Sequence, residues 1–530
     1  HTLHLARDVT IGNGAWRIGD WIVVATSSFS PFESEFVQIA TINPNNNGGT
    51  DLTLTQALHH YHFGSADPGV PSAANFGASK DVNFGVDERS EVGLISRSIT
   101  LTSETPKIAA NPNDPELHWG GEIRILQGFA EASIQGVELE KFGKERLGSY
   151  PIHLHMVGDA SNSKTLFNSN SIHHSYNKCI AVHSSSSLTF ENNVCARAVG
   201  HLFYEEIGNE YNISFLNNLG LGAMSSSFGI DLASPKTPKT ANGQAKNWWE
   251  GDNLALANDY DGLDVLDMDD QSNPTHGSCY AQKLDGAGNP YLVGATQPPC
   301  NNNFPIYVEP ATGFWIVNPS TILKGNSIGG CQGMGKGYWY VPPATPDARY
   351  PGIEKLKFNE VGAFENNRVH ACYDGLFDEG EAAVSSTEQL FPKKGNVEQA
   401  FNVIAHFNGL TATRIRNRGT WMRPTWNVLE QGRFATNRDS AVLVSSGGPD
   451  GNAPGVWALL QDSVLVGVST NNVDRWGPCP NTTDGENSGC VDYNPKSYDL
   501  FGKRYQTPAW NSAGYMIYDG PVRIFHNHFV

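Results

Sequence analysis

Six of the 17 histidines in this 530-residue chain fall between positions 153 and 201. Histidine is the most common metal ligand in proteins and the usual acid or base near neutral pH, so this concentration indicates chemistry. The histidines occur in three phrases: SYPIHLHMVGD at 149–159, NSIHHSYNKCIAVHSS at 170–185 and GHLFYEEIGNE at 200–210. What they can do depends on how the fold stacks these three segments.

We predict that His155, His183 and Glu205 form one column on successive strands, with the apolar residues before them facing a core. Strands in a sheet lie about 4.8 Å apart, so three such side chains can reach one ion. Two histidines and a carboxylate are a common catalytic metal set, and the expected cofactor is a divalent metal, with Ca²⁺ and Zn²⁺ both possible. The column can instead perform metal-free proton transfer, or only hydrogen-bond along the stack. We expect His153 on the opposite side from His155, in a supporting role.

A second constellation, VDERSEVGLISRSITL, contains Asp87, Arg89, Glu91 and Arg97. The first three residues share one face of an extended strand, because side chains repeat every second residue. Such a row is either a structural ion network or a general acid, Asp87 or Glu91, beside arginines that bind a substrate carboxylate.

A third group, TRIRNRGTWMRP, places Arg414, Arg416 and Arg418 on one face of a predicted strand, with Trp421 nearby. Arginine binds a carboxylate and an aromatic ring stacks on a pyranose, so this pattern is suited to a sugar acid. A solvated strand face is the alternative.

The elements that position these residues repeat along the chain. An apolar strand, a polar turn and an Asn-containing phrase recur at intervals in the low twenties, as in NSNSI, FENNV, FLNNL, LKGNSI and FENNRV. This period predicts an all-β fold, a right-handed parallel β-helix with asparagines stacked at its turns. Residues 1–105 indicate β-sandwich-like strands, 106–222 the first part of the β-helix, 223–310 an inserted Asp/Pro/Gly-rich region and 311–530 the rest of the β-helix. Within the insertion, Asp259, Asp261 and Asp264 are a weak Ca²⁺ candidate, more consistent with a solvated loop.

The net charge of −18 argues against a nucleic-acid partner. No apolar run is long enough to span a membrane. The eight cysteines include Cys279/Cys300 and Cys479/Cys490, whose spacing suits local disulfides, and the sequons at Asn212 and Asn481 permit glycosylation. These features predict an extracellular or cell-surface location.

Eight phrases resemble, in order, the family of the cell-surface hyaluronidase, the cell-migration-inducing hyaluronan-binding protein and the fibrocystins: WRIGDWIVVATSSF, VDERSEVGLISRSI, GSYPIHLHMVGD, NSIHHSYNKCIAVHSS, GHLFYEEIGNE, GFWIVNPS, GLTATRIRNRGTWMR and YDGPVRIF. The resemblance implies the C-terminal part of an eight-glycine module followed by a disulfide-bonded parallel β-helix. It also implies functional roles for His153, His155, His173, His174 and His183, and for Asp87, Arg89, Glu91 and Arg97.

Together, residues and resemblance predict an extracellular endo-glycosidase, hyaluronidase-like, that acts on a uronate-containing or related polysaccharide. In this hypothesis Asp87, Glu91, His155, His183 and Glu205 are catalytic, the last three also hold the metal, and Arg89, Arg97, Arg414, Arg416, Arg418 and Trp421 bind substrate. A polysaccharide lyase, a non-catalytic adhesion or surface-structural protein and a glycan-binding protein without turnover are the alternatives.

Overall fold

The computed structural model describes residues 2–12, 14–29, 31, 33–45, 48–58, 60, 62–64, 85–103, 120–144, 148–224, 283–284, 290–291, 311–332, 335–342, 356–378, 390–423, 426–445, 457–467, 513–519 and 521–529. These residues are almost entirely β-structure. The two helices among them are short 3-10 turns, η5 (Leu356–Phe358) and η6 (Lys394–Asn396). No helix in this part of the chain has the length and apolarity that a membrane crossing requires.

The N-terminal region forms a five-stranded antiparallel sheet with the order β1-β4-β3-β2-β5. One face of this sheet has its own apolar core around Ile22, Val37 and Leu52. The opposite face presents Val23 and Ile95 to the rest of the molecule. We call residues 2–97 of this region the N-terminal module. Its strands are β1 (Thr2–Leu5), β2 (Trp21–Val24), β3 (Glu35–Pro44), β4 (Thr50–Leu54) and β5 (Val92–Leu94).

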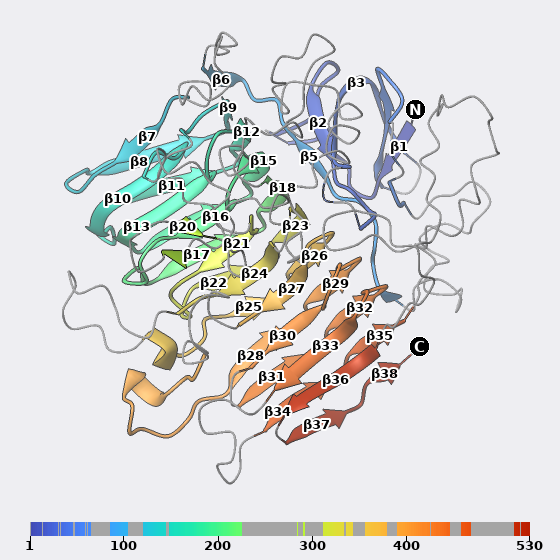
Figure 1. The fold of residues 1–530 in the computed structure, drawn as a ribbon. Coiled ribbons are helices and arrows are strands. Elements are labelled where there is room, and N and C mark those ends of the chain that lie inside the picture. Colours follow the sequence, from blue (N-terminus) through green and yellow to red (C-terminus); the bar gives the residue numbers. More distant parts are fainter. Residues whose placement is uncertain are drawn as a thin grey trace.

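The remainder is a parallel β-helix, as predicted, in which three long parallel sheets share one core (Figure 1). Sheet 1 contains β7 (Ile123–Ile125), β10 (Ile152–Asp159), β13 (Ile180–Ser186), β16 (Phe203–Glu205), β21 (Phe314–Ile316), β24 (Lys336–Tyr340), β27 (Asp374–Phe377), β30 (Thr420–Met422), β33 (Ser440–Ser445) and β36 (Ala513–Asp519). Sheet 2 contains β8 (Glu131–Gln135), β11 (Lys164–Asn168), β14 (Leu188–Glu191), β17 (Ile213–Leu216), β22 (Ile322–Lys324), β25 (Phe364–Glu365), β28 (Ala405–Asn408), β31 (Asn427–Glu430), β34 (Ala458–Gln461) and β37 (Val522–Phe525).

Sheet 3 contains β6 (Ile99–Thr102), β9 (Val137–Glu140), β12 (Ser171–Ser175), β15 (Val194–Val199), β18 (Leu219–Met224), β23 (Ser327–Cys331), β26 (Arg368–His370), β29 (Thr411–Thr413), β32 (Arg433–Ala435), β35 (Val464–Val466) and β38 (His528–Phe529). The N-terminal module packs on this sheet, where Val23 and Ile95 meet Val194 and Leu221. In Figure 1 the blue module lies beside the strands of sheet 3.

The insertion occupies a single connection of the β-helix. Strands β16, β17 and β18 pair with β21, β22 and β23, so residues before 224 and after 311 form neighbouring rungs. Within the insertion the structure describes one short antiparallel pair, β19 (Lys283–Leu284) and β20 (Pro290–Tyr291). The Ca²⁺ candidate at Asp259–Asp264, the cysteines 279, 300, 479 and 490 and the sequon at Asn481 lie outside the described residues.

The recurring asparagine phrase builds the corner between sheets 2 and 3. The ladder consists of Asn170, Asn193, Asn218, Asn326 and Asn367. From Asn193 onward, each amide oxygen accepts a side-chain and a backbone N–H bond from the asparagine of the previous rung. The residue just before each of them has a positive φ, which asparagine and glycine tolerate best. The predicted stacking of asparagines is therefore confirmed.

Candidate metal centre

The histidine-rich phrases fold into β10 and β13, two adjacent strands of sheet 1. Ile152 and Leu154 face the apolar core, opposite Ile180 and Val182, and His155 is paired with His183, as predicted. Because side chains alternate along a strand, the residues between the core positions point outward.

His153 and His155 therefore share the outer face of β10. The prediction that they lie on opposite sides was wrong, since a spacing of two residues places both on one face. The strand bulges after His155, where Met156 has a positive φ.

The three outward histidines, His153, His155 and His183, lie close together. One ring nitrogen from each lies within 4.8 Å of the others, the Nδ1 atoms of His155 and His183 are 3.1 Å apart, and the His153 and His183 rings are nearly parallel. His153 and His183 are buried, whereas His155 is partly exposed and opens the cluster to solvent. A tetrahedral ion with metal–nitrogen distances of about 2.0–2.1 Å separates two ligands by about 3.3 Å, close to the observed pair.

The protonation state of His153 follows from its hydrogen bond. Its Nδ1 lies 3.1 Å from the carbonyl oxygen of Gly148, which can only accept, so Nδ1 carries the proton. Nε2 is then unprotonated and carries a lone pair. It is buried and has no hydrogen-bond partner among the described residues. A ring that donates from one nitrogen to a carbonyl and offers the other is the usual form of a metal-binding histidine.

Burial favours the neutral form of His153 and His155. Burial lowers the pKa of His153 to about 3, with smaller effects of His155, Arg124 and His183. The pKa of His155 is also lowered, first by burial and then by Arg124. Neutral imidazoles are the form that binds metal, so the lone pairs are available at neutral pH without proton release.

The predicted position of Glu205 was wrong. The register pairs Val182, not His183, with Glu205, so the carboxylate belongs to an interior column of the β-helix. There it accepts N–H bonds from Val317 and Asn318, both 3.0 Å, and a hydroxyl bond from Thr321. Burial raises the pKa of Glu205 to about 8.

The next residue, Glu206, faces the histidines instead. One of its carboxylate oxygens lies 3.4 Å from Nδ1 of His183. Glu206 was not singled out from the sequence, although a shift of one residue in the predicted register would have selected it. His183 itself is followed by Ser184 at positive φ, whose N–H donates to the carboxylate of Glu210 at 2.7 Å.

Asp87, Arg89 and Glu91 do not join this cluster, because they contact β26 of sheet 3. Arg89 binds Asp87 with two hydrogen bonds of 2.7 Å, and Arg368 bridges Asp87 and Glu91 at 3.1 and 3.0 Å. His370 adds a 2.9 Å bond to Glu91. These neighbours lower the pKa of Asp87 well below its usual range, and that of Glu91 to about 2, despite burial.

Arg97 and the other two histidines of the motif also lie at the contact between module and β-helix. The Nε of Arg97 donates to the carbonyl of Ser169 at 2.7 Å. His173 lies 3.1 Å from Glu138, and the ring of His174 packs against Phe36 of β3. Their positions indicate docking of the module.

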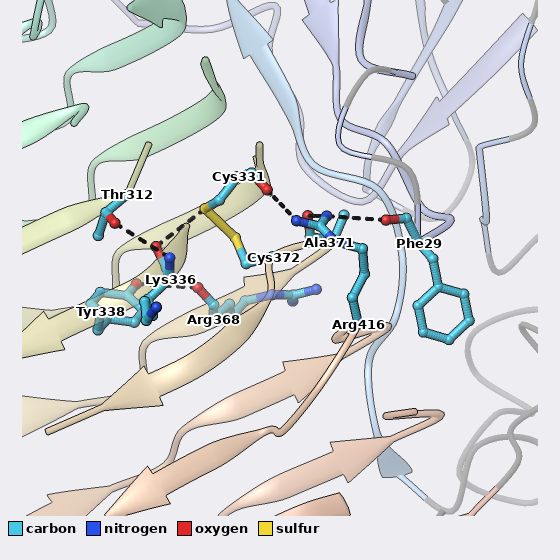
Figure 2. Close-up of a disulfide and its surroundings, with 9 residues drawn as sticks. All are labelled: Phe29, Thr312, Cys331, Lys336, Tyr338, Arg368, Ala371, Cys372 and Arg416. Carbon is cyan, nitrogen blue, oxygen red and sulfur yellow. Dashed lines mark hydrogen bonds between the residues drawn. A yellow bond between two sulfur atoms is a disulfide. The ribbon is translucent and has the colours of Figure 1, made fainter. Parts of the chain in front are cut away.

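Residues 414–418 form a corner between β29 and β30, so the predicted strand with three arginines on one face was wrong. Arg414 has a positive φ, is buried and packs over the ring of Phe29. Arg416 is buried as well and donates to the carbonyls of Cys331 and Ala371 at 2.5 and 2.8 Å (Figure 2). Neither side chain is accessible to a sugar.

Arg418 and Trp421 are placed differently, on the outer face of sheet 1. The guanidinium of Arg418 lies 4.2 Å from the ring centroid of Trp421 and is 27% exposed. The disulfide between Cys331 and Cys372, shown in Figure 2, joins the two rungs that precede this corner, and a second disulfide joins Cys179 and Cys195.

Comparisons with known proteins confirm the resemblance derived from the ordered motifs. The CEMIP beta-helix family model matches residues 118–256 and 294–376. The chain is 25% identical to "Cell surface hyaluronidase CEMIP2" of Homo sapiens over 557 residues, which covers 99% of this chain and 34% of that protein. It is 25% identical to "Cell migration-inducing and hyaluronan-binding protein" of Mus musculus over 548 residues, 96% of this chain and 34% of that protein.

A third relative, fibrocystin-L of Mus musculus, is 24% identical over 444 residues, which covers 77% of this chain and 8% of that protein. The chain thus spans about a third of the length of the first two relatives and a smaller share of the third.

Proposed function

We propose that this chain, whose β-helix matches the CEMIP beta-helix family, is a metal-dependent extracellular enzyme that cleaves a uronate-containing polysaccharide at His153, His155 and His183. The observation that carries the proposal is the unprotonated Nε2 of buried His153, which has no hydrogen-bond partner among the described residues and lies beside two further histidines. Three histidines with an open side are a common catalytic set for a divalent ion of the zinc type. The names of two relatives, a hyaluronidase and a hyaluronan-binding protein, support hyaluronan as the first polysaccharide to test.

The residues of this chain have distinct roles in the proposed reaction. A divalent ion held by the three histidines would supply Lewis acidity and lower the pKa of water. Gly148 fixes the ring of His153 through its carbonyl. Glu206, next to His183, is the carboxylate placed to accept a proton from water and return it to the leaving sugar oxygen. Arg124, on the neighbouring strand, adds positive charge that favours an anionic sugar.

The test combines metal content with cleavage. Purified protein, and the variants His153→Ala, His155→Ala and His183→Ala, are analysed by plasma mass spectrometry and incubated with hyaluronan. We expect about one transition metal per wild-type chain, loss of metal in each variant and at least a hundredfold loss of cleavage. His406→Ala, an exposed histidine on β28, and Glu205→Gln should keep the metal.

Three outcomes contradict parts of the proposal. Metal-free protein with three folded, fully active variants would exclude the histidine cluster as the active site. Products with an unsaturated, ultraviolet-absorbing end would identify a lyase instead of a hydrolase. Binding of hyaluronan without any products would favour the second candidate, a glycan-binding protein, which the name of the Mus musculus relative supports.

A further inference from the structure

Four successive rungs of sheet 1 begin with the same four-residue pattern, in which the second residue is glycine and the fourth is aromatic. The phrases are Thr312-Gly313-Phe314-Trp315, Lys336-Gly337-Tyr338-Trp339, Asp374-Gly375-Leu376-Phe377 and Arg418-Gly419-Thr420-Trp421. The strand register superimposes them position by position. The third residue of each of the first three phrases belongs to the core of the β-helix.

The glycine of each phrase lets the rung approach its neighbours. A Cβ at Gly337 would lie 2.3 Å from the side chain of Val369, and one at Gly375 would lie 2.3 Å from the carbonyl oxygen of Gly419. The second and third residues of each phrase therefore face the core of the β-helix. The first and fourth residues lie on the outer face. Consistent with this, the ammonium of Lys336 lies 4.2 Å from the ring centroid of Trp339 and 4.8 Å from that of Phe377.

The first position of the phrase places three charges in a row: Lys336 on β24, Asp374 on β27 and Arg418 just before β30. Lys336 is paired in register with Asp374, and the backbone N–H of Arg418 donates to Oδ1 of Asp374 at 3.3 Å. The fourth position runs beside this row as Trp339, Phe377 and Trp421, with the rings of the last two nearly parallel.

Two polar groups in this row have no hydrogen-bond partner within the described part of the chain. Oδ2 of Asp374 is buried, and the residue is 1% exposed. Arg418 bonds Asp439 through Nε at 3.2 Å, while its two terminal nitrogens donate no hydrogen bond to any described residue. Arg418 and Phe377 are both partly exposed, so they form the open side above buried Asp374.

We propose that Asp374, Arg418, Phe377 and Trp421 form a second saccharide-binding site, specific for a sugar residue that carries a carboxylate. The terminal nitrogens of Arg418 bind the carboxylate as a two-pronged donor. Asp374 binds a sugar hydroxyl through Oδ2, and Lys336 balances its charge. The partly exposed ring of Phe377 provides the apolar surface on which a pyranose packs, while Trp421 is buried beneath the guanidinium of Arg418 and supports it.

The pKa of Asp374 agrees with this role. Burial raises it, while Lys336 and Arg418 act in the opposite direction. In either protonation state Oδ2 can exchange a hydrogen bond with a hydroxyl group, which is both a donor and an acceptor.

The second site lies on the same outer face as the histidine cluster. Four rungs separate β13 from β27 in sheet 1, which at about 4.8 Å per rung amounts to about 19 Å. A polysaccharide longer than this distance can reach both sites by passing over the buried cluster of Tyr204, Trp315, Trp339 and Leu356 that lies between them. This inference rests on the proposed polysaccharide ligand but not on its cleavage.

The experiment measures binding of a uronate-containing decasaccharide by calorimetry, against the same oligosaccharide with its carboxyl groups reduced to alcohols. We expect the wild-type protein to prefer the acidic form, and Arg418→Met to bind it about tenfold to a hundredfold more weakly and to lose the preference. Asp374→Ala, which removes the oxygen that bonds the hydroxyl group, should weaken binding of both forms. Arg433→Met, which removes the same charge from an exposed position on β32, is the matched control.

Failure of this site and failure of the proposed enzyme give different results. If the site exists, His155→Ala and His183→Ala keep the carboxylate preference whether or not they lose cleavage. The proposal is overturned if folded Arg418→Met binds both oligosaccharides as the wild type does. It is also overturned if the wild-type protein shows no preference, a result that would leave cleavage at the histidine cluster a separate question.

Discussion

At the residue scale, His153 determines what the histidine cluster can do. The carbonyl of Gly148, which can only accept, assigns the proton of His153 to Nδ1. Burial of His153 disfavours the imidazolium, so the ring stays neutral well below the usual pKa of a histidine. The cluster is thus preorganised for a metal ion, which accepts electron pairs. The cost is a lower stability of the folded protein at low pH.

This cost is a testable pH dependence. The pKa of His153 is about 3 in the folded protein against 6.5 for an unperturbed histidine, so the unfolded chain binds more protons between these values. The free energy of unfolding of metal-free protein should therefore fall as the pH is lowered from about 6.5 towards 3. His153→Asn retains a donor for Gly148 but does not titrate. Denaturant titrations at several pH values should therefore show that its free energy of unfolding depends less steeply on pH than that of the wild type. An unchanged pH dependence would contradict the assignment.

At the element scale, the asparagine ladder sets the register of the β-helix. Asn218 accepts two hydrogen bonds from Asn193 and donates to Asn326 and to the carbonyl of Phe190. Asn218→Ala leaves buried polar groups without partners, and we expect it to lower the free energy of unfolding by about 2–4 kcal/mol in chemical denaturation. Asn212→Gly, at an exposed corner with positive φ, should change it by less than about 0.5 kcal/mol.

The ladder also explains how far the sequence could predict the fold. Asparagine phrases revealed the period, and single apolar positions aligned Ile152 with Ile180 correctly. The third rung failed because Leu202 and Phe203 are both apolar and buried, and only packing selects Phe203, which stacks on Phe314 at 4.5 Å. Arg414, Arg416 and Arg418 have the two-residue spacing that is typical of one face of a strand. They lie in a corner instead, and Arg414 has a positive φ there.

At the scale of the whole molecule, the N-terminal module is held on sheet 3 by an apolar patch and by charged contacts. Val23 and Ile95 supply the patch, and Arg368 bridges Asp87 and Glu91 from the β-helix side. Distant parts of the sequence meet here, and no local pattern in the VDERSEV phrase identifies Arg368 as its partner. The sequence could therefore suggest an ion network but not its docking role.

Substitution of Arg368 tests the docking of the N-terminal module separately from metal binding at the histidine cluster. Arg368→Met leaves Glu91 with His370 alone and Asp87 with Arg89 alone, so we expect the free energy of unfolding to fall by about 2–3 kcal/mol. Metal content should remain that of the wild type, because the histidine cluster lies on sheet 1. Arg433→Met, an exposed arginine on sheet 3, controls for the loss of charge.

Asp87→Asn tests the same interface from the module side. If Asp87 only docks the module, the double variant Asp87→Asn/Arg368→Met should be destabilised by less than the sum of the single variants, because both remove one interaction. Cleavage by each folded variant, measured well below its melting temperature, should then stay within a few-fold of wild type. A loss of cleavage of a hundredfold or more in folded Asp87→Asn, with unchanged stability, would instead place this carboxylate in the chemistry and require a substrate that reaches from sheet 1 to the module.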